Sequence, residues 1–426
     1  MRQHPAMDAP APARAIVAHR RGTHEIVALL AGMMAMNALA LDTMLPALPA
    51  IGADLGIAAA NRTQLVIVAY MFGFGASQLL WGPLADRFGR RPVLLAGVSL
   101  YVLFGLLAAA AGDFTLLIAA RFAMGACGAV SRVLVLAIVR DLYEGEEMAR
   151  IMSLTQMTFM VVPVIAPSLG QLVLAIAPWR AIFYGLAAYG VLLFAWSAAR
   201  LPETLHAEHR RAIRPASLAQ GLMITATDRL SLGYTLALTA VFTTLVAYLA
   251  SVQQIIGTLF GAGERLGTVF AMIAAPMALA SFTNSRIVRR FGLRRVGHAG
   301  LVAFVGAALF HLGWHLLVGS TLESFVVLMA LVLVAFAFTT SNFGTLAMTN
   351  MAPVAGIASS VQGTASTVGA AVLGFAIGQA FDGTLLPFLV GITLSGLAAL
   401  ALTLVTERGR LFHRRYCPLP PLPADQ

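Results

Sequence analysis

Twelve apolar segments, each long enough to cross a lipid bilayer as a helix, limit the fold of this chain more than any other feature. A membrane-spanning helix needs about 20 mostly apolar residues, and it satisfies its own backbone hydrogen bonds where no water is present. The sequence therefore predicts an all-α membrane protein with twelve transmembrane helices. The predicted spans cover residues 26–49, 64–85, 93–111, 115–140, 153–177, 180–199, 233–259, 267–285, 297–318, 323–347, 357–381 and 385–406.

Charge is scarce in this chain and unevenly placed. Charged residues make up 11% of it, against about 25% in soluble domains, which excludes the soluble classes. The net charge of +10 could suggest nucleic-acid binding, but all 28 basic residues are Arg and lie in short runs between the apolar segments. We therefore expect a lipid bilayer around the chain and no nucleic-acid partner. Cys127 lies in an apolar segment and Cys417 in the tail, so we expect no disulfide, metal framework or cofactor.

The arginines also predict the orientation in the membrane. Segments on the side of the N-terminus hold 23 Arg, the opposite loops hold 3, and Arg121 and Arg132 lie inside the fourth span. Under the positive-inside rule, this asymmetry predicts that both termini are cytoplasmic.

A polar stretch divides the spans into two sets of six and is interpreted as a loop between two bundles. The loop after the second span contains Arg-Phe-Gly-Arg-Arg at 87–91, and the loop after the eighth contains Arg-Phe-Gly-Leu-Arg-Arg at 290–295, 203 residues later. Because six spans return the chain to the same side, we predict two parallel repeats about an axis normal to the membrane. The expected parts are a cytoplasmic tail (1–25), a first six-helix bundle (26–199), a cytoplasmic linker (200–232), a second bundle (233–406) and a cytoplasmic Pro-rich tail (407–426).

The loop after the second span carries a recognisable motif. It reads Gly82-Pro83-Leu84-Ala85-Asp86-Arg87-Phe88-Gly89-Arg90-Arg91-Pro92 and closely resembles the signature loop of the major facilitator superfamily. In such transporters the substrate site lies near the midplane between the two halves. Asp86 can cap a helix end or pair with an Arg, holding the halves together on that side. The alternative is a solvated charge run that serves only topology. The resemblance implies a cytoplasmic gate of Gly82, Asp86, Arg87, Gly89, Arg90 and Arg91.

The fifth span carries a second motif. Pro163, Pro167 and Gly170 are spaced i, i+4, i+7 and share one face, which predicts a kinked, close-packing helix. The segment 166–171 resembles the Gly-Pro-x-x-Gly-Gly antiporter motif of drug–proton exchangers, with Ala166 and Gln171 in place of two glycines. The alternative is that Pro and Gly are simply common in membrane helices.

Several further segments together resemble the Bcr/CflA branch of drug efflux transporters. They are Asn37 to Pro49 in the first span, Arg121 to Gly125 and Val139 to Tyr143 in the fourth, Asn284-Ser285-Arg286 after the eighth, and Ala358-Ser359-Ser360 in the eleventh. The resemblance covers nearly the whole chain. It implies a monomeric protein of the bacterial inner membrane that exports small lipophilic molecules in exchange for protons by alternating access.

Three ionisable residues lie well inside the predicted spans, where a charge costs several kcal/mol and marks a functional candidate. At 1.5 Å per residue, Asp42 lies ~10 Å and Arg121 ~9 Å from the outer ends of their spans, and Arg132 lies ~16 Å deeper than Arg121. Equal depth favours a pair between Asp42 and Arg121, with Asp42 as the proton carrier. The resemblance likewise associates the acidic residue of the first span and the Arg of the fourth with coupling. The alternative is a purely structural ion pair, and Arg132 could bind an anionic part of the substrate or pair structurally.

Other polar residues in the spans are candidates for the substrate cavity. Interhelical hydrogen bonds are their commoner use, so both interpretations stay open. His311 and His315 are four apart but have no acidic or Cys partner nearby, so no metal site is predicted. The candidates are Asn37, Tyr70, Arg132, Tyr248 and Asn342.

Three functions compete for this fold. The first is a proton-driven exporter of drugs or related small molecules, and the second is a proton symporter that imports one metabolite. The motif of the fifth span favours export. The third is a membrane enzyme, which would need converging His, Asp or Ser groups near one membrane face. No such cluster is evident in the sequence, so we expect no enzyme activity.

Overall fold

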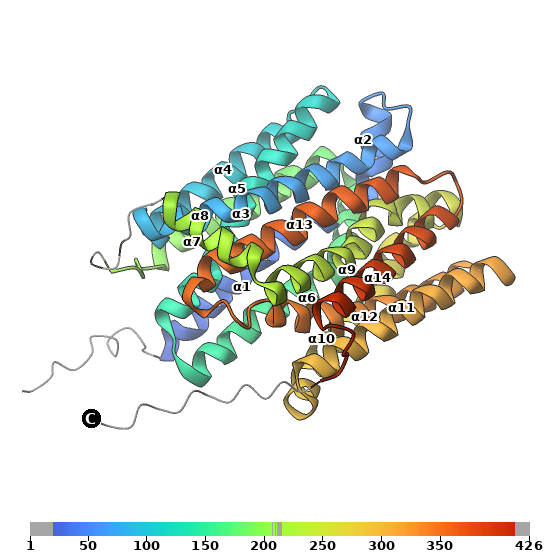
Figure 1. Cartoon of the computed structure of the whole chain (residues 1–426). Helices are drawn as coiled ribbons and strands as arrows, with labels where there is room; N and C mark the ends of the chain where they lie inside the picture. Colours follow the sequence, from blue (N-terminus) through green and yellow to red (C-terminus); the bar gives the residue numbers. More distant parts are fainter. Residues whose placement is uncertain (1–19, 207, 209, 211–214, 414–426) are drawn as a thin grey trace, which may run out of the picture.

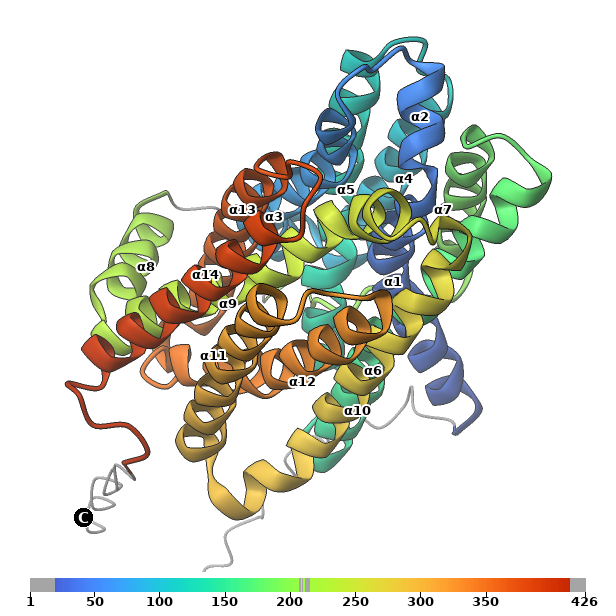
Figure 2. The same cartoon turned by 90° about the vertical axis from the view of Figure 1, so that its right-hand side faces the viewer.

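The computed structural model describes residues 20–206, 208, 210 and 215–413, and every regular element in them is a helix. Eleven of these helices are long and apolar enough to cross a membrane, and α6 (Gly145–Ile176) contributes a shorter apolar helix, Val161–Ile176. Figures 1 and 2 show the helices running side by side through one bundle. The predicted all-α, twelve-span fold class is confirmed, with span ends within a few residues of the observed ones for most helices.

The first half of the fold is built from the helices up to α7. The strongest packing within it joins α3 to α5, α4 to both α5 and α7, and α1 to α6. Its elements are α1 (Arg20–Asp42), the 3-10 turn η2 (Leu45–Ala47), α2 (Leu48–Asp54), η3 (Ala60–Gln64), α3 (Leu65–Phe88), α4 (Arg90–Ala109), α5 (Phe114–Leu142), α6, and α7 (Arg180–Arg200).

The second half repeats the pattern with six more spans. Here α9 packs against α13 and α14, and α12 packs against α10 and α11. Its elements are α9 (Arg229–Gln253), the π-helical extension η5 (Gln254–Leu259), η6 (Gly263–Arg265), α10 (Leu266–Phe291), α11 (Leu293–Leu317), α12 (Leu322–Ala347), η7 (Ala352–Val354), α13 (Ala355–Gln379) and α14 (Leu386–Thr406).

The two Arg-Phe-Gly loops have the same backbone conformation, as expected for repeats. Gly89 ends α3 with φ 102° and ψ 155°, and Gly292 ends α10 with φ 85° and ψ 154°. Both φ values are positive, a region that glycine enters without the penalty that a side chain brings. We call the face that holds these loops the terminal side, and the opposite face, which holds α2, the distal side (Figure 1).

The linker was predicted as a loop, and this prediction is wrong for part of it. Residues 215–227 form the helix α8 (Pro215–Thr227), which packs against α13 of the second half. Asp228 then caps α9 by accepting the amide of Ser231. The helix is short and follows a run of charges, so its signal in the sequence is weak. The predictions for residues 1–19, for 207, 209 and 211–214 in the linker, and for 414–426 in the Pro-rich tail lie outside the described residues.

The first span was predicted as one continuous helix, and the structure shows it broken. α1 ends at Asp42, and a turn with η2 leads into α2. Pro46 and Pro49 follow directly, and proline removes a backbone donor and disfavours an uninterrupted helix. The break leaves carbonyl groups of the last turn of α1 without their usual amide partners, and it forms the centre of the candidate site.

The main contacts between the two halves are made by two pairs of helices. α3 packs on α13, and α6 packs on α10. Toward the middle of the first pair, Thr364 Oγ1 donates to the carbonyl of Gly75 at 2.9 Å and Gln78 Nε2 to Thr367 Oγ1 at 3.5 Å.

Candidate functional site

Asp42 stands at the break in the first span, and side chains bind the carbonyls around it. Asp42 itself is buried, with 4% of its surface exposed. Thr43 Oγ1 donates to the carbonyl of Leu39 at 2.6 Å, and Arg121 Nη1 donates to the carbonyl of Ala40 at 3.1 Å. The end of α1 is therefore fixed by a hydroxyl from its own chain segment and by a cation from α5.

Arg121 is fully buried and connects several helices of the first half. Its Nε donates to the carbonyl of Val66 in α3 at 2.9 Å. Its guanidinium lies 4.5 Å from the ring centre of Tyr70 and 5.8 Å from that of Phe183, distances at which a cation and an aromatic face attract each other. These contacts hold the charge in an apolar surrounding without a carboxylate.

The predicted ion pair between Asp42 and Arg121 is not formed in this structure. Among the ion pairs of the described residues, none includes either side chain. Arg121 uses its donors on backbone carbonyls instead, and its Nη2 is buried without a hydrogen-bond partner. Depth along a helix predicted the common height of the two residues but not which way each side chain points.

The motif of the fifth span packs against the break. Gly170 in α6 lies so close to Thr43 that a Cβ atom there would overlap the Thr43 carbonyl and crowd the ring of Pro46. Pro163 and Pro167 both lie inside α6. Gly170 thus lets α6 approach the break next to Asp42, and the link between this motif and exchange stays a prediction.

The second half contributes Tyr248 to the surroundings of Asp42. Tyr248 is fully buried in α9, and its hydroxyl has no hydrogen-bond partner. Its ring stacks on Phe270 of α10 at 5.5 Å. Residues of α9 also contact η2, so the helix that carries Tyr248 lies at the boundary between the halves, beside the break at Asp42.

Asn37 and Tyr70 were candidates for the substrate cavity, but their contacts favour the alternative of interhelical hydrogen bonds. The Tyr70 hydroxyl donates to Asn37 Oδ1 at 2.8 Å, and Asn37 Nδ2 donates to Ser131 Oγ at 2.7 Å. All three side chains are buried. They join α1, α3 and α5 next to Arg121, and so support the site from within the first half.

Asn342 and Arg132 are the remaining cavity candidates. Asn342 is buried and donates to Asn284 Oδ1 at 2.8 Å and to the carbonyl of Phe338 at 2.6 Å, which joins α12 to α10. Arg132 is half-buried in α5, eleven residues after Arg121 and therefore on nearly the same helix face. The substrate-binding roles of Tyr248, Asn342 and Arg132 stay predictions.

The gate candidates on the terminal side bind within the first half. Arg90 Nη1 lies 2.6 Å from Asp86 Oδ1, and Arg90 Nε lies 3.1 Å from Asp141 Oδ2. Arg91 Nη2 donates to the carbonyl of Ala198 at 2.6 Å. Asp86 pairs with an Arg as expected, but that Arg is in its own loop. The role of Asp86 in holding the halves together stays a prediction for the state that is closed on this side.

The other gate candidates lie around these ion pairs. Arg87 is exposed, with its guanidinium 5.2 Å from the ring centre of Phe88. Gly82 is half-buried in α3, and a Cβ atom at this position would lie 4.0 Å from Ser360 Oγ of α13.

Two glutamates that the sequence analysis did not single out anchor the repeated loops. Glu203 follows α7 and accepts the amides of Arg90 at 2.9 Å and Arg91 at 3.3 Å. Glu407 follows α14, and Arg294 Nε donates to it at 2.9 Å. The glutamates are 204 residues apart and the loops are 203 residues apart. This spacing was available in the sequence and could have identified the two residues as equivalent.

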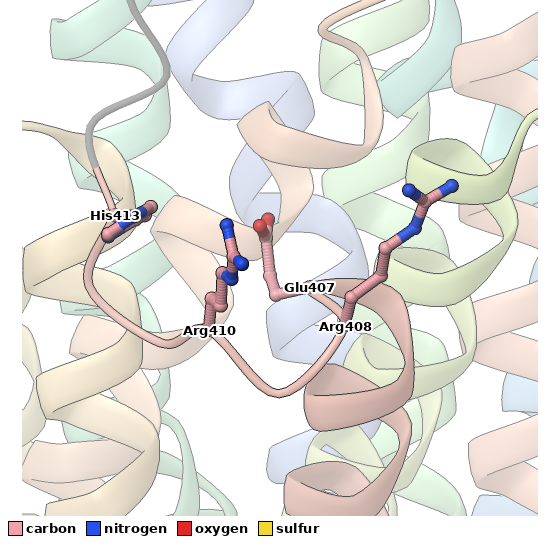
Figure 3. A pocket seen from close by; sticks show the side chains of 4 residues that line it. All are labelled: Glu407, Arg408, Arg410 and His413. Atoms are coloured by element: carbon pink, nitrogen blue, oxygen red, sulfur yellow. The ribbon is translucent and has the colours of Figure 1, made fainter.

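The surroundings of Glu407 are shown in Figure 3, where Arg408, Arg410 and His413 line a pocket beside it. The Tyr234 hydroxyl also donates to Glu407, at 2.6 Å. Burial acts to raise the pKa of Glu407, but the hydrogen bonds from Tyr234 and Arg294 and the charge of Arg294 outweigh it and leave the pKa below its usual range. Glu407 therefore stays ionised and bound to the repeated loop of the second half.

The described residues contain no group of three or more His, Cys, Asp or Glu side chains placed to hold a metal ion. The arrangement offers one buried carboxylate at a helix break, a buried guanidinium that holds that break, and an unpartnered hydroxyl across the boundary. Such groups can take up and release a proton, bind a small molecule, or both.

Known proteins resemble this chain in sequence and in fold. The family model described as Major Facilitator Superfamily matches residues 30–374. The chain is 32% identical over 255 residues to a bicyclomycin resistance protein homolog of Haemophilus influenzae, a match that covers 59% of this chain and 63% of that protein. It is 32% identical over 350 residues to the multidrug resistance protein MdtL of Shewanella oneidensis, covering 78% of this chain and 83% of that one.

Solved structures support the fold. A D-xylose–proton symporter superimposes with a TM-score of 0.71 at 14% identity and covers 88% of this chain and 96% of its own. The human organic anion transporter MFSD10 gives a TM-score of 0.62 at 19% identity, with 90% of this chain and 99% of that one covered. At such identities the likeness concerns the fold alone.

Proposed function

The chain belongs to the major facilitator superfamily, and from this premise we propose that it exports drugs or related small lipophilic molecules in exchange for protons. It is a multi-pass membrane transporter for small molecules and not an enzyme. The names of its relatives, resistance proteins for bicyclomycin and for multiple drugs, support export. We place it in the bacterial inner membrane with the terminal side in the cytoplasm, because the Arg residues gather on that side.

The observation that carries the proposal is the state of Asp42. Its carboxyl group is buried at a helix break, beside the boundary between the halves, and has no ion-pair partner among the described residues. An ionised carboxylate in an apolar environment is costly unless it is paired. A proton or a cationic substrate would remove this cost, so Asp42 is suited to bind the two alternately.

The surrounding residues position this exchange. Arg121 keeps the carbonyl of Ala40 and the start of α3 together, so that the break stays in place when the halves move. Tyr248 is carried by the other half, and its distance from Asp42 changes whenever the halves tilt. We propose that the first bundle, α1–α7, and the second, α9–α14, move against each other around this point and open it to one side of the membrane at a time.

A transport assay in inverted membrane vesicles tests the proposal. With a proton gradient, the native protein should drive the uptake of a fluorescent dye into the vesicles, and adding a transported drug to vesicles should release protons. Asp42→Asn should abolish both signals while the protein still inserts. Asp113→Asn is the matched control, because Asp113 caps the start of α5 by accepting the Leu116 amide and Asn caps equally well. Normal proton-driven transport by Asp42→Asn would disprove the role of Asp42. If the dye moves across the membrane in the same direction as the protons, and not in the opposite direction, the protein is an importer and not an exporter.

A further inference from the structure

On the distal side, the two halves are joined by side-chain carboxamides. Gln64 Nε2 donates to Gln254 Oε1 at 2.7 Å, and Gln254 Nε2 donates to Asn61 Oδ1 at 2.9 Å. Gln379 Nε2 donates to the Asn61 carbonyl at 2.7 Å and to Gln64 Oε1 at 3.2 Å. Asn61 and Gln64 belong to η3 of the first half, and Gln254 and Gln379 belong to η5 and α13 of the second. Every one of these bonds therefore crosses the boundary.

Backbone carbonyls of α13 and the turn after it complete this network. Asn61 Nδ2 donates to the carbonyls of Gln379 at 3.1 Å and Phe381 at 3.0 Å, and Gln64 Nε2 donates to that of Gly378 at 3.0 Å. Gly378 has no side chain, and a Cβ atom there would overlap the amide of Gln64. The end of α13 is thus shaped to receive a carboxamide from the other half.

A second crossing on the same side is made by Gln171, at the end of the motif in α6. Its Nε2 donates to the carbonyls of Gly263 at 3.0 Å and Glu264 at 3.1 Å, and its Oε1 accepts the amide of Gly267 at 2.9 Å. The antiporter motif has glycine at this position, and glycine could form none of these bonds. The departure from the motif therefore adds three hydrogen bonds between the halves.

The terminal side is bonded differently. The ion pairs that the described residues form there, from Arg90 to Asp86 and Asp141, from Arg200 to Glu25 and from Arg294 to Glu407, each stay within one half. The structure thus shows the halves bonded together on the distal side, and the bonds that do so come from neutral side chains.

We propose that Asn61, Gln64, Gln171, Gln254 and Gln379 form a distal latch, which closes the outer end of the transport pathway and is built so that it does not titrate. A carboxamide keeps both its donor and its acceptor over the whole physiological pH range. The proton therefore acts on the pathway at Asp42 and not at the latch. Breaking the latch bonds exposes the space beside Tyr248 and Asp42 to the outside. The inference rests on the proposed movement of the halves, but not on the identity of the substrate.

Cysteine labelling in intact cells tests the latch without substrate or proton gradient. In a chain with Cys127 and Cys417 replaced by Ala, Ser251→Cys introduces a reporter that is buried in α9, three residues before Gln254. A membrane-impermeant maleimide is added outside. We expect slow labelling in the parent and at least about tenfold faster labelling in Gln64→Leu, because the loss of even one of the three hydrogen bonds of the Gln64 side chain shifts an equilibrium by roughly a factor of ten. Gln171→Gly, which restores the motif, should also label faster.

Two controls make the result decisive. Gln362→Leu removes a buried carboxamide from α13, but Gln362 Nε2 donates to the Gly344 carbonyl inside the second half, so labelling should not change. Arg265→Cys places an exposed thiol on the distal side and should label at once in every variant. Parent-like labelling of the reporter in both Gln64→Leu and Gln171→Gly, with Arg265→Cys labelled, would overturn the latch while leaving proton-driven export standing. Faster labelling in Gln362→Leu as well would equally overturn it, because the effect would then be general loosening.

Discussion

Arg121 donates a hydrogen bond of 3.1 Å to the carbonyl oxygen of Ala40, two residues before Asp42, and makes no ion pair with the Asp42 carboxylate. A direct pair would have fixed the charge of Asp42. The observed bond fixes the end of the helix that carries it, and leaves the carboxyl group available to a proton or a substrate. We therefore propose that Arg121 is a positioning residue, which acts on Asp42 through the backbone of α1.

The first prediction concerns the two carbonyl bonds of Arg121. In Arg121→Lys the charge is kept, but an ammonium lacks the planar fork that reaches Val66 and Ala40 together. A hydrogen bond from a charged group contributes about 1.5–3 kcal/mol, so we expect the proton-driven dye transport rate to fall at least roughly tenfold. The pH at which transport is half-maximal should also shift, because Asp42 is displaced. Arg265→Lys, at an exposed position, should transport normally. An Arg121→Lys variant with native rate and pH profile would show that the fork is not needed.

The second prediction concerns the contact of α6 with the break. Gly170→Ala places a methyl group on the Thr43 carbonyl, and overpacking of this kind costs about 1–3 kcal/mol. We expect a lower thermal unfolding temperature of the purified protein and a loss of transport. Gly185→Ala is the matched control, because a Cβ atom there meets nothing within 4 Å and alanine favours a helix. Equal stability and transport of the two variants would contradict the close packing at Gly170.

The third prediction makes the latch respond to pH. In Gln254→Glu, a protonated carboxyl group can still donate to Asn61 Oδ1 and accept from Gln64, as Gln254 does. An ionised carboxylate only accepts, so it repels Asn61 Oδ1, while Asn61 Nδ2 remains bound to the carbonyls of Gln379 and Phe381. The variant should therefore be latched at low pH and should open as the pH rises. The measurement is the labelling rate of Ser251→Cys between pH 5 and 8, divided at each pH by the rate of the exposed Arg265→Cys thiol, because maleimides react with the thiolate and its fraction rises with pH.

The control for this change is the unmodified latch. The charged side chains nearest along the elements of the latch, Arg62, Glu264 and Asp382, are all exposed, so the labelling rate of the parent relative to that of Arg265→Cys should stay equally low throughout this range. A flat profile in Gln254→Glu would mean that the bond to Asn61 does not hold the halves together.

The fourth prediction concerns the anchor of the second repeated loop. Because the pKa of Glu407 is lowered in the folded protein, its ionised form stabilises the fold above the unfolded pKa of about 4.3, and this contribution is lost as the pH falls through the lower folded value. Glu407→Gln should therefore lower the free energy of unfolding by about 1–3 kcal/mol at pH 7. Its deficit relative to the native protein should shrink below pH 4, as thermal unfolding at the two pH values would show. Glu264→Gln, on the exposed η6, should change neither value. A deficit that is the same at both pH values would refute the ionic anchor.

Most of the fold could be predicted from the sequence because a bilayer leaves few choices. Apolar length and internal hydrogen bonding locate the spans, and the repeated Arg-Phe-Gly loops reveal the two halves. The break at Asp42 was also signalled, by Pro46 and Pro49, but a hydropathy pattern does not distinguish a broken span from a continuous one. α8 was missed because it is short and follows a run of charges, and its partner α13 is remote in the sequence.

The site was only partly predictable, since depth in the membrane says nothing about the direction of a side chain. Asp42 and Arg121 do lie near the same break, but they are not paired. Asn37 and Tyr70 hydrogen-bond to each other, which favours a structural role, and their place in a substrate cavity stays a prediction. Gln171 was noticed only as a departure from a motif, and its partners Gly263 and Gly267 come from the other half, so their meeting depends on the tertiary structure.

The neutrality of the distal latch also determines how the latch responds to the membrane voltage. A charge that moves across the membrane gains or loses about 2.3 kcal/mol per 100 mV, so a gate made of ion pairs would be pulled by the membrane voltage as it opens. Asn61, Gln64, Gln171, Gln254 and Gln379 carry no charge to be pulled, and external salt has nothing to screen in them. The voltage would then act only on the proton and on any charged substrate. The distal latch would open equally easily in an energised and in a depolarised cell.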